Sequence, residues 1–446
     1  MAEILPEDVH KILGKYMLVD GYDLVLDPRK SKGSWVYDAE RGCYFLDFFT
    51  FFASSPIGYN HPKLTEPEFI RKLGEVAVNK PANSDLYTVE MAEFVDTFTR
   101  VAVPEYMKYL FFVSGGALAV ENGLKVAMDW KVRKNFSRGL RDEKGHQVIH
   151  FEEAFHGRSG YTLSLTNTFD PRKTKYFAKF DWPRIINPKI TFPLNDENLR
   201  KVKELEETAI EQINNAIAER GDDICSLIIE PIQGEGGDNH FRAEFFKQLR
   251  KICDENELVF IVDEVQAGVG LTGKMWAYQH YGIKPDIIAF GKKTQVCGIM
   301  VGSLVDEVDN HVFKESSRIN STWGGNLIDM VRATKYFEII EEERLVENAA
   351  KMGDYLQKRL HELGDNYPEI ISNIRGKGLM CAFDLPDSKT RDMVKDTVYK
   401  NLMIVLPCGE KSIRFRPALN INQDEIDRGI EILDKSIKEV VSGQKN

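Results

Sequence analysis

Two stretches of this sequence decide the fold: residues 258–266 read LVFIVDEVQ and residues 286–292 read DIIAFGK. Each contains a short run of apolar residues that ends in polar ones. Apolar runs without alternation are typical of strands that are covered on both faces of a sheet. The polar residues that follow, Asp263 and Lys292 foremost, would then lie at the carboxyl ends of the strands. Active sites of parallel α/β sheets gather at that edge.

Similar apolar runs precede these two along the chain, at residues 109–113, 147–151 and 226–229. Helical patterns separate them, the first from Ala117 to about Lys134. Alternation of strands with helices favours right-handed crossovers and a largely parallel sheet. We therefore expect an α/β protein whose large domain spans residues 91–330.

The two ends of the chain differ from this central pattern. Residues 1–90 mix turns with short strand-like pieces at 24–26 and 34–37, and we expect them to contribute to a small domain and to the active site. Residues 331–446 predict a small α/β domain. Its expected elements are a long helical stretch that begins near Leu327, strands at 378–383 and 403–406, and a helix from about Gln423 to Val441, with Asn422 and Glu425 as a capping pair.

Composition narrows the class of protein. The chain has 446 residues, 43% hydrophobic and 29% charged, with a formal net charge of -10. That balance argues against a nucleic-acid surface, which needs clustered lysine and arginine. The start has no signal or transit pattern, no apolar run is long enough to cross a membrane, and the six cysteines are scattered. These features predict a cytoplasmic protein with reduced cysteines that serve packing, and no metal site.

A loop of small residues, Ser114-Gly115-Gly116-Ala117, joins the strand at 109–113 to the following helix. Such a loop lets backbone N–H groups approach an anion, and the helix dipole favours negative charge there. Phosphate is a natural ligand for this arrangement. A tight strand-to-helix turn without a ligand is the alternative.

Asp263 and the pair Lys292-Lys293 each follow an apolar strand. A buried acid needs a cationic partner, which could be a protonated pyridine nitrogen, a metal ion or a structural ion pair. A lysine in apolar surroundings can lose its proton and act as a nucleophile, although an isolated lysine is usually a surface residue. One α/β segment thus contains a candidate phosphate loop, a strand-end acid and a strand-end lysine. This combination indicates a pyridoxal phosphate (PLP) site.

Two further stretches carry arginines. Phe155 and Arg158 follow the strand at 147–151 and offer an aromatic face for a flat ring and a fork for a carboxylate. Arg414 and Arg416 are two residues apart, so on a strand both would share one face. The pattern alone does not choose between them, and a solvated edge strand is the simpler interpretation.

At these residues the sequence resembles the class III aminotransferases of fold type I, over nearly the whole chain from about Asp20. The key match is residues 262–266 followed by 286–292, where the family places its Schiff-base lysine six residues after an Asp. That spacing selects Lys292 over Lys293. Two positions depart from the wider class: Leu118 replaces an acid, and residues 293–296 replace a glycine-rich run.

The resemblance implies a role for each matching residue. Lys292 and Asp263 would be catalytic, and Asp263 would pair with the pyridine nitrogen. The phosphate would be held by Gly116 and Ala117, the ring by Phe155, and the ring hydroxyl by Gln266, with Glu230 nearby. Thr322 would reach the phosphate of a neighbouring subunit, which implies a homodimer with shared active sites.

Within the class, residues 49–55, 155–162, 179–183, 230–237, 291–298 and 321–326 resemble enzymes that act on the terminal amine of lysine. This implies transfer of the ε-amino group of L-lysine to 2-oxoglutarate, giving 2-aminoadipate 6-semialdehyde and L-glutamate. Arg158 would hold the α-carboxylate of lysine. Glu235 would neutralise Arg414 in the first half-reaction and swing away in the second. Another ω-aminotransferase, with ornithine, GABA or a diamine as donor, is the alternative, and a loop acid in a glycine turn is the simpler interpretation of Glu235.

Overall fold

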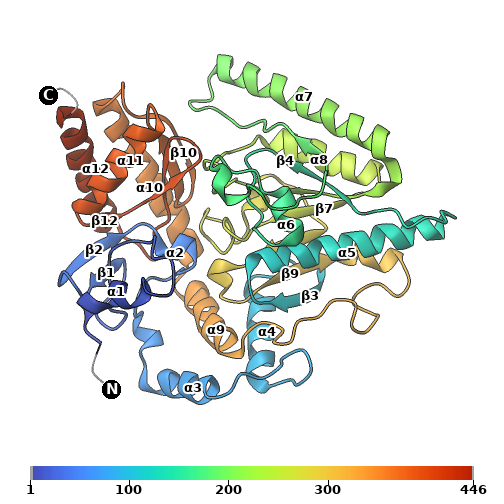
Figure 1. Cartoon of the computed structure of the whole chain (residues 1–446), viewed down its shortest axis with the longest axis horizontal. Coiled ribbons are helices and arrows are strands. Elements are labelled where there is room, and N and C mark those ends of the chain that lie inside the picture. Colours follow the sequence, from blue (N-terminus) through green and yellow to red (C-terminus); the bar gives the residue numbers. More distant parts are fainter. Residues whose placement is uncertain (1–3, 444–446) are drawn as a thin grey trace.

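The computed structural model describes residues 4–443, and its centre is a seven-stranded sheet (Figure 1). In spatial order the strands are β3 (Met107–Val113), β9 (Cys297–Gly302), β8 (Ile287–Phe290), β7 (Val259–Asp263), β6 (Ile224–Ile229), β4 (Gln147–Phe151) and β5 (Arg184–Ile185). Only β9 runs antiparallel to its neighbours in this sheet. The expected α/β class with a mostly parallel sheet is confirmed.

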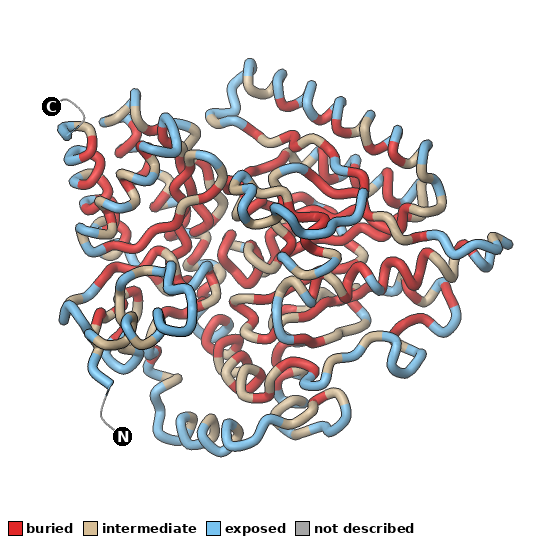
Figure 2. The backbone as a smooth tube through the Cα atoms, viewed as in Figure 1, coloured by how far each residue is buried: buried red, intermediate tan, exposed pale blue. Residues whose placement is uncertain are grey.

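Both faces of this sheet are covered, as the apolar runs predict. Along β7, Val259 and Ile261 pack into one core with α5 (Gly116–Ser137), whereas Phe260 and Val262 pack into the other core with α8 (Ala243–Glu255). The remaining helices of this part are α4 (Val89–Val101), α6 (Gly160–Leu165), α7 (Asp196–Arg220) and α9 (Leu327–Glu342). Figure 2 shows the resulting buried band through the middle of the molecule.

A second, smaller part contains a four-stranded antiparallel sheet. Its strands, in spatial order, are β10 (Ser372–Lys377), β11 (Met380–Asp384), β14 (Ser412–Phe415) and β13 (Leu406–Cys408). Its helices are α10 (Leu345–Asn366), α11 (Ser388–Lys400) and α12 (Gln423–Gly443). The expected pair at the start of α12 is present, because Asn422 Oδ1 accepts from the backbone of Glu425 at 3.0 Å and the Glu425 carboxylate accepts from the backbone of Asn422 at 3.1 Å.

The N-terminal segment joins this smaller part. Its strands β1 (Trp35–Asp38) and β2 (Cys43–Asp47) form a three-stranded sheet with β12 (Met403–Ile404), which pairs parallel to β2 (Figure 1). Short helices α1 (Val9–Leu13), α2 (Thr50–Ala53) and α3 (Pro67–Ala77) complete this segment. We propose the divisions 1–90, 91–330 and 331–446 as domains. The β2–β12 pairing supports a small domain to which both ends of the chain contribute. Residues 1–3 and 444–446 lie outside the described residues.

Three local interpretations of the sequence were wrong, and one was incomplete. Of residues 24–26 only Leu26 takes part in a β-bridge, with Asp38. The run 403–406 is divided between β12 and β13, which belong to different sheets. The helical stretch expected from Leu327 is present, but Arg344, whose φ of 51° is left-handed, divides it into α9 and α10. The strand with Arg414 is not a solvated edge, because β14 lies between β11 and β13 and is buried throughout.

Two further expectations concern the state of the cysteines and helices that could cross a membrane. All six cysteines are unpaired, and Cys225, Cys253, Cys381 and Cys408 are buried, in line with a packing role. Cys297 differs, since it lines a cavity described below. Among residues 4–443, no helix is both long and apolar enough to cross a membrane.

Candidate active site

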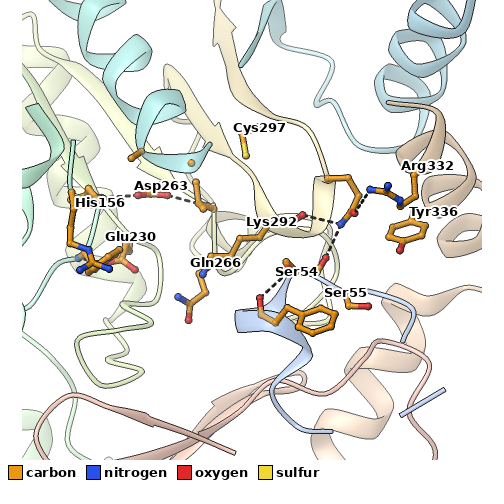
Figure 3. A pocket seen from close by; sticks show the side chains of 18 residues that line it. Ser54, Ser55, His156, Glu230, Asp263, Gln266, Lys292, Cys297, Arg332 and Tyr336 are labelled. Atoms are coloured by element: carbon orange, nitrogen blue, oxygen red, sulfur yellow. Dashed lines mark hydrogen bonds and ion pairs between the residues drawn. The ribbon is translucent and has the colours of Figure 1, made fainter. Parts of the chain in front are cut away.

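A cavity of about 740 Å³ opens at the carboxyl ends of β4, β6, β7 and β8. Most of the site residues expected from the sequence line it, as Figure 3 shows for several of them. They are Gly116, Ala117, Phe155, Arg158, Glu230, Asp263, Gln266 and Lys292. Thr322, Glu235 and Arg414 are not among the residues that line it.

The small-residue loop leaves an open cradle at the start of α5. Gly115 precedes the helix with a φ of 117°, and no side chain caps the helix start. A Cβ at Gly116 would lie 2.8 Å from a methyl group of Val265, and one at Gly157, where φ is 127°, would lie 2.5 Å from Cβ of Ala117. The first backbone N–H groups of α5 therefore remain available to an anion, and the helix dipole favours one there.

The two adjacent lysines have different environments. The Lys293 ammonium is buried and donates to the carbonyl oxygens of Gln266 at 2.7 Å and Ala53 at 3.2 Å, so it is committed to the backbone. Lys292 enters the cavity instead, and in the described part of the chain no hydrogen bond of its amine is recorded (Figure 3). Burial lowers the pKa of Lys292 to about 8, helped by the positive charges of Arg414 and Arg416 and opposed by Glu230 and Asp263. Lys292 is therefore the available nucleophile.

Asp263 ends β7 and is held on both carboxylate oxygens. Oδ1 accepts from the backbone N–H of Val265 at 3.0 Å, and Oδ2 lies 2.8 Å from Nδ1 of His156. Sequence patterns assign no role to His156, although it follows Phe155 just after a strand. The other ring nitrogen of this histidine is buried without a recorded partner among residues 4–443.

Glu230 fixes the loop that carries Phe155. Its carboxylate accepts from the backbone N–H of Phe155 at 2.9 Å and from that of Gly234 at 3.1 Å. Burial raises the pKa of this carboxyl group. Glu230 thus fixes the backbone of Phe155, a residue that lines the cavity.

The structure distinguishes the two arginines that the sequence pattern left equivalent. Arg416 is fully buried and forms a two-pronged ion pair with Asp238, with Nη1 at 2.8 Å from Oδ2. Arg414 has no carboxylate within salt-bridge distance among the described residues. Its Nη1 donates to Oε1 of Gln266 at 2.8 Å, and Arg416 donates to the same oxygen at 3.1 Å. Arg414 is therefore the guanidinium that an anionic ligand can still neutralise.

Two further expected residues, Glu235 and Thr322, lie outside the cavity wall. Glu235 forms an ion pair with Lys173, and no ion pair between Glu235 and Arg414 is present in the described structure. Thr322 is exposed in the loop before α9, where its carbonyl oxygen accepts from the hydroxyl of Ser84 at 3.2 Å. Arg158 does line the cavity, and its side chain is exposed to solvent.

The opposite wall contains residues that sequence patterns did not predict for the site: Phe51, Ser54, Ser55, Gln295, Cys297, Arg332 and Tyr336. Gln295 links its parts, because its Nε2 donates to the carbonyl of Ser54 at 2.7 Å and its Oε1 accepts from Arg332 at 3.3 Å. Residues 50–53 form a left-handed turn, with φ between 42° and 64°. Such a turn is strained for residues other than glycine and has no periodic signal in a sequence.

Together these residues form the donor set of a PLP-dependent enzyme. The reactive amine of Lys292, the buried carboxylate of Asp263 and the uncapped start of α5 fit an aldehyde, a pyridine nitrogen and a phosphate. The model of the aminotransferase class-III family matches residues 16–437, so the chain belongs to the class III aminotransferases, whose cofactor is PLP.

The relatives are similar over nearly their whole length. The chain is 51% identical to the L-lysine-epsilon aminotransferase of Streptomyces clavuligerus over 436 residues, which cover 97% of this chain and 95% of that protein. It is 52% identical to the protein of the same name from Mycobacterium tuberculosis (strain ATCC 25618 / H37Rv) over 426 residues, covering 95% and 94%. The solved structure of lysine aminotransferase from M. tuberculosis in the internal aldimine form superposes with a TM-score of 0.96 at 51% identity, covering 98% of this chain and all of that one.

Proposed function

We propose that this class III aminotransferase transfers the ε-amino group of L-lysine to 2-oxoglutarate, giving 2-aminoadipate 6-semialdehyde and L-glutamate. The observation that carries the proposal is the identity of about half of all residues, over nearly the full length, to relatives named L-lysine-epsilon aminotransferase.

Bound PLP would supply an electron sink for the bond to be broken at the substrate's amine-bearing carbon. Gly116 and Ala117 would bind its phosphate through backbone N–H groups, and Phe155 would lie against its ring. The carboxylate of Asp263 would keep a proton on the ring nitrogen. Gln266, whose carbonyl oxygen is occupied by Arg414 and Arg416, would offer its amide Nε2 to the ring hydroxyl.

Lys292 is the proposed proton carrier. Its pKa of about 8 leaves a useful fraction of its amine unprotonated near neutral pH, so Nζ can accept a proton from the substrate carbon and return it. Asp263 and Glu230 partly offset the repulsion from the two buried arginines and keep the charged form accessible. A general base works best when its pKa lies near the working pH.

Two substrates of different charge would use one cavity. Arg158 would bind the carboxylate that is distant from the reacting carbon, which is the α-carboxylate of lysine and the γ-carboxylate of 2-oxoglutarate. Arg414 would bind the second carboxylate of 2-oxoglutarate, and Glu235 would cover that charge while lysine is bound. The ion pair of Glu235 with Lys173 supports the conformation in which Arg414 is uncovered.

The proposed enzyme is a homodimer in the cytoplasm. Thr322 supports shared sites, because it is exposed and stands outside the cavity of its own chain, where it could serve a second one. Phe51 and Phe52, which are 41% and 51% exposed beside the cavity, would gain cover from a partner.

An amino-donor panel tests the substrate assignment. The purified holoenzyme is mixed with 2-oxoglutarate and either L-lysine, L-ornithine, GABA or a diamine, and glutamate formation is followed. Lysine is expected to give the highest kcat/KM. If ornithine, GABA or a diamine is the better donor, the chain is another ω-aminotransferase, and the lysine assignment is wrong.

A further inference from the structure

Lys173 forms an ion pair with Glu235 but contacts neither substrate nor cofactor in the proposed reaction. Lys173 ends a short helical turn (Pro171–Lys173) in the connection between α6 and β5. The two side chains are only 19% and 31% exposed, for Glu235 and Lys173 respectively. A pair that is largely covered on both sides is screened less by salt than a surface pair.

The backbone of Glu235 is fixed close to the strand that carries Arg414. Its carbonyl oxygen accepts at 2.8 Å from the N–H of Gly409, which lies in the turn between β13 and β14. Because that hydrogen bond holds the main chain, the carboxylate can change partner by rotation of its own side chain.

Both candidate partners of that rotation have unused hydrogen-bonding atoms. Oε2 of Glu235 and Nε of Arg414 are each buried without a recorded partner in the described part of the structure. Burial lowers the pKa of Arg414, and among the charges nearby those of Asp238 and Glu235 oppose that shift. Glu235 is thus near enough to Arg414 to act on its charge while it is paired with Lys173.

We propose that Lys173 is a positioning residue for Glu235, which sets how often Arg414 is free to bind a second carboxylate. The inference rests on the proposed function and deepens it. Lys173 and Arg414 compete for one carboxylate. The ammonium of Lys173 stabilises the conformation that accepts a dicarboxylate, and its loss shifts Glu235 towards Arg414. The apparent affinity for dicarboxylates then falls by the fraction of molecules in which Arg414 is covered.

The experiment uses the PLP-loaded enzyme and two unreactive acids: glutarate, with two carboxylates, and pentanoate, with one. Binding is measured by calorimetry for the wild type and for Lys173→Met. The variant is expected to bind glutarate on the order of fivefold more weakly and pentanoate unchanged, because a partly buried ion pair contributes at this scale. In steady state the KM for 2-oxoglutarate should rise with little change in kcat.

Three further variants separate a positioning role of Lys173 from a general loss of structure. Lys173→Arg keeps the charge and should restore glutarate binding. Lys175→Met, a change at an exposed lysine two residues away, should bind both acids like the wild type. In a Glu235→Gln background, Lys173→Met should have no further effect on glutarate.

The inference is overturned if Lys173→Met binds glutarate as the wild type does, or if it loses glutarate and pentanoate equally. It is also overturned if the effect persists in the Glu235→Gln background. Glutarate binding needs no amino donor, so these outcomes are independent of the donor panel. Failure of lysine in that panel would remove the proposed substrate and leave the role of Lys173 to be judged on binding alone.

Discussion

The Asp263 carboxylate and the His156 imidazole form a buried pair, with Oδ2 and Nδ1 2.8 Å apart and side-chain exposures of 5% and 0%. The histidine therefore fixes the orientation of the acid that would face the pyridine nitrogen. A hydrogen bond to a charged group contributes about 1.5–3 kcal/mol, so its loss should be measurable in cofactor affinity.

Replacing His156 with Phe keeps a flat ring and removes that donor. We expect PLP to bind about tenfold or more weakly, because the Asp263 carboxylate loses its fixed position. Equilibrium binding to the apoprotein, followed by PLP absorbance, measures the change. Asp263→Asn is the matched variant and should lose more, and an unchanged affinity in His156→Phe would contradict the positioning role.

Lys292 and Lys293 should respond differently to substitution. Lys292→Ala should lose activity by several orders of magnitude, because no other described amine enters the cavity. Lys293→Met should keep the bound cofactor and much of the activity, with a lower unfolding temperature since two backbone carbonyls lose their donor. Turnover and the PLP absorbance band separate the two variants. The opposite ranking would mean that the wrong lysine was assigned.

The lowered pKa of Lys292 has a directly measurable pH dependence. A pKa of about 8 in place of the usual 10.5 means that the free amine increases as pH rises through about 8 and is nearly complete by about pH 9. In the apoprotein, labelling of Lys292 by an amine-reactive reagent, read by peptide mass spectrometry, should follow that curve. A midpoint near 10.5 would show that burial does not perturb this amine.

Arg414 and Arg416 are two residues apart, and their substitutions should have different effects. Arg416→Met leaves the Asp238 carboxylate buried without a cation, which should cost about 3–5 kcal/mol of the free energy of unfolding. Arg414→Met leaves no such charge, so it should fold and bind glutarate about tenfold or more weakly. Denaturant unfolding and calorimetry give the two quantities. Arg416→Met/Asp238→Leu should recover stability relative to Arg416→Met, and no recovery would count against the buried pair as the cause.

A shared active site predicts complementation between two inactive variants. Thr322→Asp would place a negative charge beside the phosphate of the partner subunit, whereas Lys292→Ala inactivates its own cavity. After the two variants are unfolded and refolded together, a random mixture of dimers should regain about a quarter of the wild-type activity, because half of the dimers carry one intact site. Each variant refolded alone is the control. No recovery above these controls would mean that Thr322 acts in its own chain or has no role.

Much of the large domain could be predicted because the sequence patterns that specify its strands and helices lie within each element. The strand at 147–151 has the bounds of β4, and the helix expected from Ala117 begins one residue earlier. Strand-end placement pointed to the pair Lys292-Lys293, and the resemblance to the class III family, through its spacing, selected Lys292. The direction of β9 could not be read in this way, since an apolar strand has the same pattern whether it runs parallel or antiparallel.

The parts of the site that sequence patterns alone could not resolve depend on distant partners. The choice between Arg414 and Arg416 is made by Asp238, which precedes them by more than 170 residues and gives no pattern at their position. The roles of His156 and Lys173 likewise depend on the carboxylates that they contact in the folded chain, those of Asp263 and Glu235. A pairing of charges across the chain is a property of the folded molecule, and a sequence pattern reports it only when the spacing is regular.

The parallel pairing of β12 with β2 has a consequence for the order in which the molecule is made. The ribosome releases the chain from its N-terminus, so β2 emerges about 350 residues before the strand that completes its sheet. Throughout that interval the edge of β2 is open to other strands, and loop closure over such a length is slow. The last tenth of the polypeptide also brings Arg414, so a nascent chain can already have its lysine and its phosphate cradle while it still lacks the guanidinium that distinguishes a dicarboxylate.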